Sequence, residues 1–290
     1  MSRRGDPATP AHLLYVTGMQ TENDPRAIAL TVAGSDSGGG AGIQADLKTF
    51  HAFGVFGTSA ITAITVQNTL GVTGVHAVPL DIVTAQIAAV ASDLPPRAVK
   101  TGMLATRELV SAVAKSIRDH ALPNYVLDPV MIATSGDRLL DEDAQHAVLD
   151  ELVPLSTLVT PNLDEAAILA GFSVKDPAAM HRAARRLVAA GASAALVKGG
   201  HLRGDELVDV LYDGSTVREF RRPRIDTRST HGTGCTLSAA ITALLARGIS
   251  LSEAVEQALD FVHRAIVQAP NLGAGNGPLN HFVPARSPHP

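Results

Sequence analysis

The sequence predicts an α/β fold, a three-layer α/β/α sandwich with a mostly parallel central sheet. Predicted strands and helices alternate along most of the chain, and most of the strands are nearly continuous apolar runs. This combination is typical of a parallel sheet that helices cover on both faces. The chain has 290 residues, of which 46% are hydrophobic, so it can form one large core.

The individual elements follow from apolar periodicity and from the turn residues between them. Strands are expected at 28–33, 59–66, 98–103, 125–127, 157–160 and 194–197, before a hairpin of 207–212 and 216–220. Helices are expected after residue 42, at 81–94, 107–120 and 142–152, after residue 161, and at 177–190, 236–247 and 251–268. We predict one domain at 27–283, between a loosely ordered extension, 1–26, and a tail, 284–290.

The composition favours small-molecule partners or another copy of the chain. Lys and Arg number 24 against 28 Asp and Glu, and the net charge of -4 gives no general attraction to nucleic acids or membranes. No apolar run has the length expected of a signal-peptide core or a membrane span. The single cysteine excludes an intrachain disulfide and a multi-cysteine zinc site, so we expect a cytoplasmic protein.

A glycine-rich loop leads directly into the predicted helix at 236–247. Gly232 and Gly234 flank Thr233, and the only cysteine, Cys235, follows. The free N–H groups and the dipole of a helix N-terminus attract an anion, and glycine lets that anion approach the backbone. The loop is therefore a candidate anion site. The alternative is a tight turn beside a small, buried and inert cysteine.

Another glycine-rich loop follows the first strand. Gly40, Gly42 and Ala45 fit the G-x-G-x-x-A pattern of dinucleotide-binding proteins, but that pattern also needs an acidic residue after the second strand. The second strand ends in Gln67-Asn68-Thr69, which disfavours dinucleotide binding. The Gln67 amide offers a donor and an acceptor, as recognition of a nitrogen heterocycle requires. A turn or cap is the alternative role for Gln67.

Polar side chains follow several predicted strands and should share one edge of the sheet. They are Gln67, Asp128, Asn162, Glu165 and Lys198. A lysine, oxygen side chains suited to magnesium and an anion-binding loop together favour phosphoryl transfer from a nucleotide. Helix capping and charge pairing are the alternatives for Asp128, Asn162 and Glu165. The phosphate-binding motif G-x-x-x-x-G-K-[ST], the zinc motif H-E-x-x-H and the hydrolase motif G-x-S-x-G do not occur.

A series of collinear motifs carries a family resemblance. They are A-G-S-D-S-G-G-G-A-G-I-Q-A-D-L-K-T-F, Q-N-T, K-T-G-M-L, L-D-P-V-M, S-G-D, T-P-N-x-x-E-A, K-G-G-H and T-H-G-T-G-C-T-x-S-A-A-I. From about residue 28 to 282 the chain resembles the hydroxymethylpyrimidine/phosphomethylpyrimidine kinases of thiamine biosynthesis, in the ribokinase-like superfamily. The resemblance implies a ribokinase-like fold without a large separate lid domain, use of ATP and Mg²⁺, and a homodimer.

The resemblance also implies a role for each matching residue. Gly232, Thr233, Gly234 and Cys235 would form the anion hole for the transferring phosphoryl group, and Lys198 would contact the nucleotide phosphates. Asn162 and Glu165 would organise magnesium through water, with Asp128 close by. Gln67 would bond the pyrimidine ring, Asp46, Met103 and Val130 would surround that ring, and Gly34 would let the backbone come close.

This branch carries cysteine where many ribokinase-like kinases carry an aspartate base. A thiol pKa can be lowered at a helix N-terminus, so Cys235 is a candidate base for the hydroxyl proton. The chain departs from the family at Gly38, where a serine is common, and in the extension at 1–26.

The expected activity is phosphorylation of 4-amino-5-hydroxymethyl-2-methylpyrimidine and then of its monophosphate. A pyridoxal-type kinase of the same superfamily is the nearest alternative. A catalytically silent pyrimidine or nucleotide sensor is a further alternative, which the presence of Lys198, Asn162, Glu165 and Cys235 disfavours.

Overall fold

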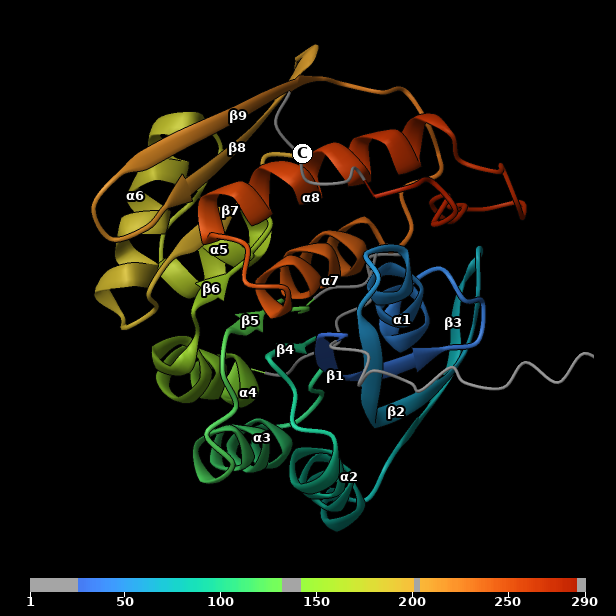
Figure 1. The fold of residues 1–290 in the computed structure, drawn as a ribbon. Helices are drawn as coiled ribbons and strands as arrows, with labels where there is room; N and C mark the ends of the chain where they lie inside the picture. The colour runs from blue at the N-terminus through green and yellow to red at the C-terminus, as the bar shows by residue number, and fades with distance from the viewer. Residues whose placement is uncertain (1–25, 132–141, 201–203, 286–290) are drawn as a thin grey trace, which may run out of the picture.

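The computed structural model describes residues 26–131, 142–200 and 204–285, and it confirms the predicted α/β/α sandwich (Figure 1). A nine-stranded sheet has the order β3-β2-β1-β4-β5-β6-β7-β8-β9. The pairs β2–β1, β1–β4, β4–β5, β5–β6 and β6–β7 are parallel, and the pairs β2–β3, β7–β8 and β8–β9 are antiparallel. The strand bounds are β1 Ile28–Asp36, β2 Phe56–Asn68, β3 Gly71–Ala77, β4 Ala98–Thr101, β5 Tyr125–Leu127, β6 Leu158–Val159, β7 Ala195–Val197, β8 Glu206–Tyr212 and β9 Val217–Pro223.

Helices cover both faces of the sheet. The bounds are α1 Gly42–Ala52, α2 Leu80–Asp93, α3 Arg107–Asp119, α4 Glu142–Ala147, α5 Leu163–Ala170, α6 Pro177–Ala189, α7 Thr233–Ala246 and α8 Leu251–Val267. Helices α1, α7 and α8 pack on one face and α2 to α6 on the other (Figure 1). Alternate residues of each buried strand serve the two cores: Leu30 points to the α2–α6 side and Ala29 to the α7 side. Among the described residues, no helix is both long and apolar enough to cross a membrane.

One strand was missed, and several element boundaries differ from the sequence prediction. Strand β3 was not expected, because its two glycines and its exposed position at the sheet edge remove the apolar alternation that marks a strand. Strand β1 continues through Gly34 to Asp36, which carries the start of the glycine loop into the sheet. Helix α7 begins at Thr233, three residues earlier than expected. The extension and the tail lie almost wholly outside the described residues, so the predicted domain limits stay a prediction.

Candidate active site

The two glycine-rich loops touch each other at one edge of the sheet. Gly232 is the N-cap of α7 and has a φ of 81°. A Cβ at Gly232 would lie 1.8 Å from the carbonyl oxygen of Gly40, so only glycine permits this approach. Gly232 makes no side-chain cap hydrogen bond to the first turn of α7, and the Thr233 N–H donates to the carbonyl oxygen of Thr230 at 3.2 Å. The predicted loop at a helix N-terminus is confirmed in its geometry.

A lysine and a carboxylate lie in front of this helix N-terminus. Lys198 Nζ is 3.3 Å from Asp128 Oδ1. A Cβ built at Gly234 would lie 3.2 Å from Lys198 Nζ and 3.9 Å from Asp128 Oδ2. Lys198 follows β7 and Asp128 follows β5, so the expectation that polar side chains at strand ends gather at one edge is confirmed for these two. The arrangement offers a cation and backbone dipoles to the same anion.

Glu165 lies beside this pair. Its carboxyl group is buried, and burial raises its pKa to about 7 although the nearby Lys198 acts to lower it. Burial acts to lower the pKa of Lys198, but Asp128 and then Glu165 raise it overall, so Lys198 is a cation at neutral pH.

Asn162 and Glu165 form a capping box at the start of α5. The Asn162 side chain accepts a hydrogen bond from the Glu165 N–H at 2.9 Å, and Glu165 Oε2 accepts one from the Asn162 N–H at 2.8 Å. The capping role that the sequence left open is therefore confirmed. A metal ion could reach these oxygens through water without breaking the cap, which agrees with the way Mg²⁺ keeps several waters. The magnesium role of these residues stays a prediction.

The residues expected around the ring occupy two different environments. A Cβ at Gly34 would lie 2.9 Å from Met103 Cε, so these two residues lie close together, and their contact with a ring stays a prediction. Val130 is half-buried, and its N–H donates to the carbonyl oxygen of Asp128 at 2.8 Å. Asp46 is fully buried, and its two oxygens accept hydrogen bonds from Lys100 Nζ and Thr31 Oγ1, both at 2.6 Å. Asp46 therefore forms a buried ion pair with Lys100. Its contact with the pyrimidine ring stays a prediction.

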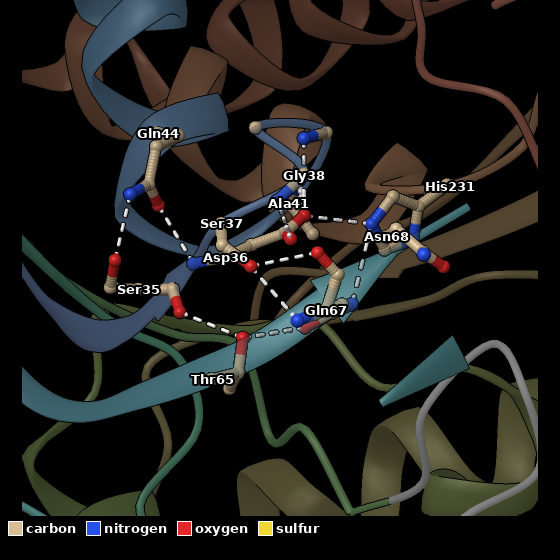
Figure 2. Close-up of polar contacts among 12 residues, drawn as sticks. Ser35, Asp36, Ser37, Gly38, Ala41, Gln44, Thr65, Gln67, Asn68 and His231 are labelled. Atoms are coloured by element: carbon tan, nitrogen blue, oxygen red, sulfur yellow. Dashed lines mark hydrogen bonds and ion pairs between the residues drawn. The ribbon is translucent and has the colours of Figure 1, made fainter. Parts of the chain in front are cut away.

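Asp36 and His231 are partners that no sequence pattern predicted. The Asp36 carboxylate accepts hydrogen bonds from the N–H groups of Gly38, Gly40 and Ala41, and His231 Nε2 lies 2.8 Å from Asp36 Oδ2 (Figure 2). Gln67 reaches the same cluster, because its Nε2 position lies 3.5 Å from His231 Nε2. The presence of Asp36 in a glycine-rich loop was the one sequence feature that could have indicated a loop held together by a carboxylate. Its histidine partner is 195 residues away, where no local pattern indicates it.

The structure contradicts the lowered pKa expected for the Cys235 thiol. Cys235 lies in the first turn of α7, yet burial raises its pKa to about 11, against a smaller lowering by Lys100. Asp128 and Asp46 add to the rise. Desolvation and neighbouring carboxylates thus outweigh the helix dipole, and the thiol is protonated at neutral pH. These contributions disfavour a thiolate base at Cys235.

Comparison with known proteins identifies the family. A family model described as phosphomethylpyrimidine kinase matches residues 36–280. The chain is 55% identical over 259 residues to the hydroxymethylpyrimidine/phosphomethylpyrimidine kinase of Rhizobium meliloti, which covers 88% of this chain and 97% of that protein.

Solved structures agree with this match. The chain is similar to an ADP complex of Bacillus subtilis pyridoxal kinase, with a TM-score of 0.83 and 41% identity over 88% of this chain and 97% of that one. It is also similar to a phosphomethylpyrimidine kinase from Clostridium difficile, with a TM-score of 0.75 and 41% identity over 83% of this chain and 100% of that one.

Proposed function

The chain belongs to the phosphomethylpyrimidine kinase family, and from this premise we propose how its own residues carry out the reaction. The protein phosphorylates 4-amino-5-hydroxymethyl-2-methylpyrimidine and then the resulting monophosphate, in thiamine biosynthesis. The observation that carries the mechanism is the meeting of Lys198, Asp128 and the N-terminus of α7 at Gly234.

The transferred phosphoryl group sits on the N–H groups of Gly232, Thr233, Gly234 and Cys235. The hydroxymethyl oxygen attacks the γ-phosphorus of ATP, the bond from that phosphorus to the bridging oxygen of ADP breaks, and the hydroxyl proton passes to solvent water. Phosphoryl transfer passes through a loose transition state, so positioning and charge stabilisation supply most of the catalysis. Lys198 supplies positive charge to the phosphates from a fixed position, because Asp128 holds its amine.

Mg²⁺ fits the donors beside Lys198. The carboxylates of Asp128 and Glu165 are hard oxygen ligands, and magnesium is commonly held by one or two carboxylates together with substrate phosphates and water. Within the described ranges, no group of three or more His, Cys, Asp or Glu side chains could hold a metal ion alone, which agrees with a site that the nucleotide completes. When bound, the ion neutralises charge on the phosphates.

A coupled assay with ATP tests the activity. Purified protein should consume ATP with the pyrimidine alcohol and, in a separate reaction, with its monophosphate. The product of each reaction should be identified by mass as the acceptor with one added phosphoryl group. If neither acceptor led to ATP consumption while the protein bound the pyrimidine tightly, the result would favour a catalytically silent pyrimidine sensor.

Pyridoxal phosphorylation is the second candidate activity, because the chain is similar to a pyridoxal kinase from Bacillus subtilis at 41% identity. Pyridoxal also carries a hydroxymethyl group on a six-membered nitrogen ring. We expect kcat/KM to be higher for the pyrimidine than for pyridoxal when both are measured under the same conditions. A preference for pyridoxal would reverse the assignment of the main substrate.

Cys235 contributes to this mechanism through its backbone N–H rather than through a thiolate. We predict that Cys235→Ala keeps kcat within about tenfold, because a lost general base would cost about 10² or more. At pH 8, iodoacetamide should alkylate Cys235, the only cysteine, about 100-fold more slowly in the folded protein than in guanidinium, since its pKa rises from 9.0 to about 11. Equal alkylation rates in the two states, or a loss beyond 10² in Cys235→Ala, would contradict this role.

The protein acts in the cytoplasm, and its single cysteine supports this location.

The protein acts as a homodimer, which exposed apolar side chains support. Ile64 and Val66 of β2 are 51% and 63% exposed, beside the edge strand β3. We predict that sedimentation equilibrium shows a dimer. Ile64→Asp should raise the dissociation constant of the dimer about 30-fold or more, because it would bury a charge in the interface. Val267→Asp, at the end of α8 and 60% exposed before substitution, is the matched control. A monomeric wild-type protein would overturn the dimer.

A further inference from the structure

A buried carboxylate lies on β8, outside the set of residues assigned to the reaction. Asp209 is 9% exposed and stands between the buried residues Val208 and Val210. It shares a face of the strand with Leu211, which packs in the same core as α7 and α8. An apolar side chain is typical of such a position, and a buried carboxylate is costly unless hydrogen bonds or opposite charges compensate it. The partners of Asp209 therefore indicate what it does.

Asp209 accepts a backbone hydrogen bond where the pairing of β7 with β8 stops. The ladder between these strands ends at the pair Val197–Val210. Two residues after Val197, the buried N–H of Gly199 donates to Asp209 Oδ1 at 2.9 Å instead of to a backbone carbonyl. A buried N–H without a partner costs free energy, so this hydrogen bond fixes the course of the chain after β7.

Lys198 lies between this hydrogen bond and the neighbouring strand. Its N–H donates to the carbonyl oxygen of Pro161, beyond the end of β6, at 2.8 Å. The backbone of Lys198 is thus held by Pro161 on the β6 side and, through Gly199, by Asp209 on the β8 side. Its side chain extends to the N-terminus of α7, where Nζ lies 3.2 Å from a Cβ built at Gly234.

The hairpin of β8 and β9 supplies a partner for the second oxygen of Asp209 (Figure 1). Arg222 Nη1 of β9 lies 3.6 Å from Asp209 Oδ2, and both side chains are largely buried. Burial raises the pKa of Asp209 overall, although the Gly199 N–H and then Arg222 act to lower it. An oxygen that can accept the Gly199 N–H is present in either protonation state.

We propose that Asp209 is a positioning residue for Lys198: by accepting the Gly199 N–H, it sets the backbone from which the lysine reaches the transferred phosphoryl group. This inference rests on the proposed function, in which Lys198 supplies charge to the phosphates. A displacement of about 1 Å in a positioned group can cost about 10²-fold in rate, so a hydrogen bond one residue away can control Lys198 without touching a substrate. A merely structural role would lower stability without any specific link to Lys198.

The first test removes and then restores the acceptor. Asp209→Leu loses the acceptor with little change in shape, and it should lower kcat about 30-fold because Lys198 is displaced. Asp209→Asn keeps an oxygen for the Gly199 N–H and should stay within about fivefold of the wild-type kcat. Chemical denaturation first establishes that each variant is folded, and Asp209→Ala replaces Asp209→Leu if the leucine variant is not. An unchanged kcat in the variant without the acceptor would overturn the proposal.

A double-mutant cycle with Lys198→Met separates positioning from stability. If Asp209 acts through Lys198, Asp209→Leu should cost less than about threefold in kcat/KM once Lys198 is methionine, because the two losses overlap. Losses that multiply in the double variant would show that Asp209 acts independently of Lys198, and they would overturn the proposal.

Asp213→Ala is the matched control. Asp213 belongs to the same hairpin and accepts hydrogen bonds from the N–H groups of Ser215 and Thr216, at 2.9 and 2.6 Å, but it is exposed at the turn. This variant should keep the wild-type kcat/KM.

Failure of the proposed function would give a different result from failure of this inference. If the wild-type protein phosphorylates neither the pyrimidine alcohol nor its monophosphate, the proposed function fails, and calorimetric titration with ATP then decides the role of Asp209. Weaker ATP binding in Asp209→Leu that is absent in the Lys198→Met background would support positioning. Equal ATP binding by the wild-type protein and Asp209→Leu would overturn it.

Discussion

Gly232→Ala should lower kcat/KM by about 10² or more and reduce the free energy of unfolding by about 2–5 kcal/mol. Two causes add at this position. An alanine at the φ of 81° is strained, and its Cβ would lie 1.8 Å from the carbonyl oxygen of Gly40. The two glycine-rich loops would have to separate, which displaces the N–H groups that hold the phosphoryl group. Steady-state kinetics and chemical denaturation measure the two effects.

Gly248→Ala separates backbone strain from the lost loop contact. Gly248 follows the opposite end of α7 with a φ of 82°, and no atom lies within 4 Å of a Cβ placed there. This variant should lose about 1–2 kcal/mol of stability and keep normal turnover. Normal turnover in Gly232→Ala would mean that the loop does not carry the reaction.

The layered fold was predictable because it depends on patterns that the chain displays locally. The apolar runs of β1, β4 and β5 are buried on both faces, and such runs identify central parallel strands. Strand β3 was missed because an edge strand needs little apolar surface, and its pairing with β2 is set by partners along the ladder. The exposed, glycine-containing residues of β3 carry no local pattern that indicates this pairing.

The candidate site was predictable only in part. Asp128 and Lys198 come together because both follow parallel strands, and topology alone places such ends at one edge. Which side chains form hydrogen bonds or ion pairs within the site depends on side-chain packing, and the spacing of residues along the sequence does not encode that packing. Asp46 therefore proved to be paired with Lys100 in the interior. The Cys235 thiol was misjudged for the same reason, because its burial outweighs its position on the helix.

Lys198→Met should lower kcat/KM by about 10³, with most of the loss in kcat. The charge of Lys198 is fixed in front of the N-terminus of α7, where negative charge moves during transfer, and removing one such preorganised group costs about 10²–10³ in kcat. Methionine keeps much of the side-chain length, so packing changes little. Lys198 acts to lower the pKa of about 7 of the buried Glu165, so Glu165 should take up a proton in the variant. This removes one of the two carboxylate charges that Lys198 faces.

Two further variants decide whether position or mere charge matters at this site. Lys198→Arg keeps the charge but replaces a compact ammonium by a planar fork, so it should recover only a small part of the activity. Lys115→Met removes a lysine that is 70% exposed on α3 and paired with Asp119, and it should leave kcat/KM unchanged. Full activity in Lys198→Met would remove this lysine from the mechanism, whereas full activity in Lys198→Arg would mean that the charge acts without a fixed geometry. The expected order, wild type far above Lys198→Arg and Lys198→Arg above Lys198→Met, requires an ammonium group held by Asp128 at the phosphoryl position.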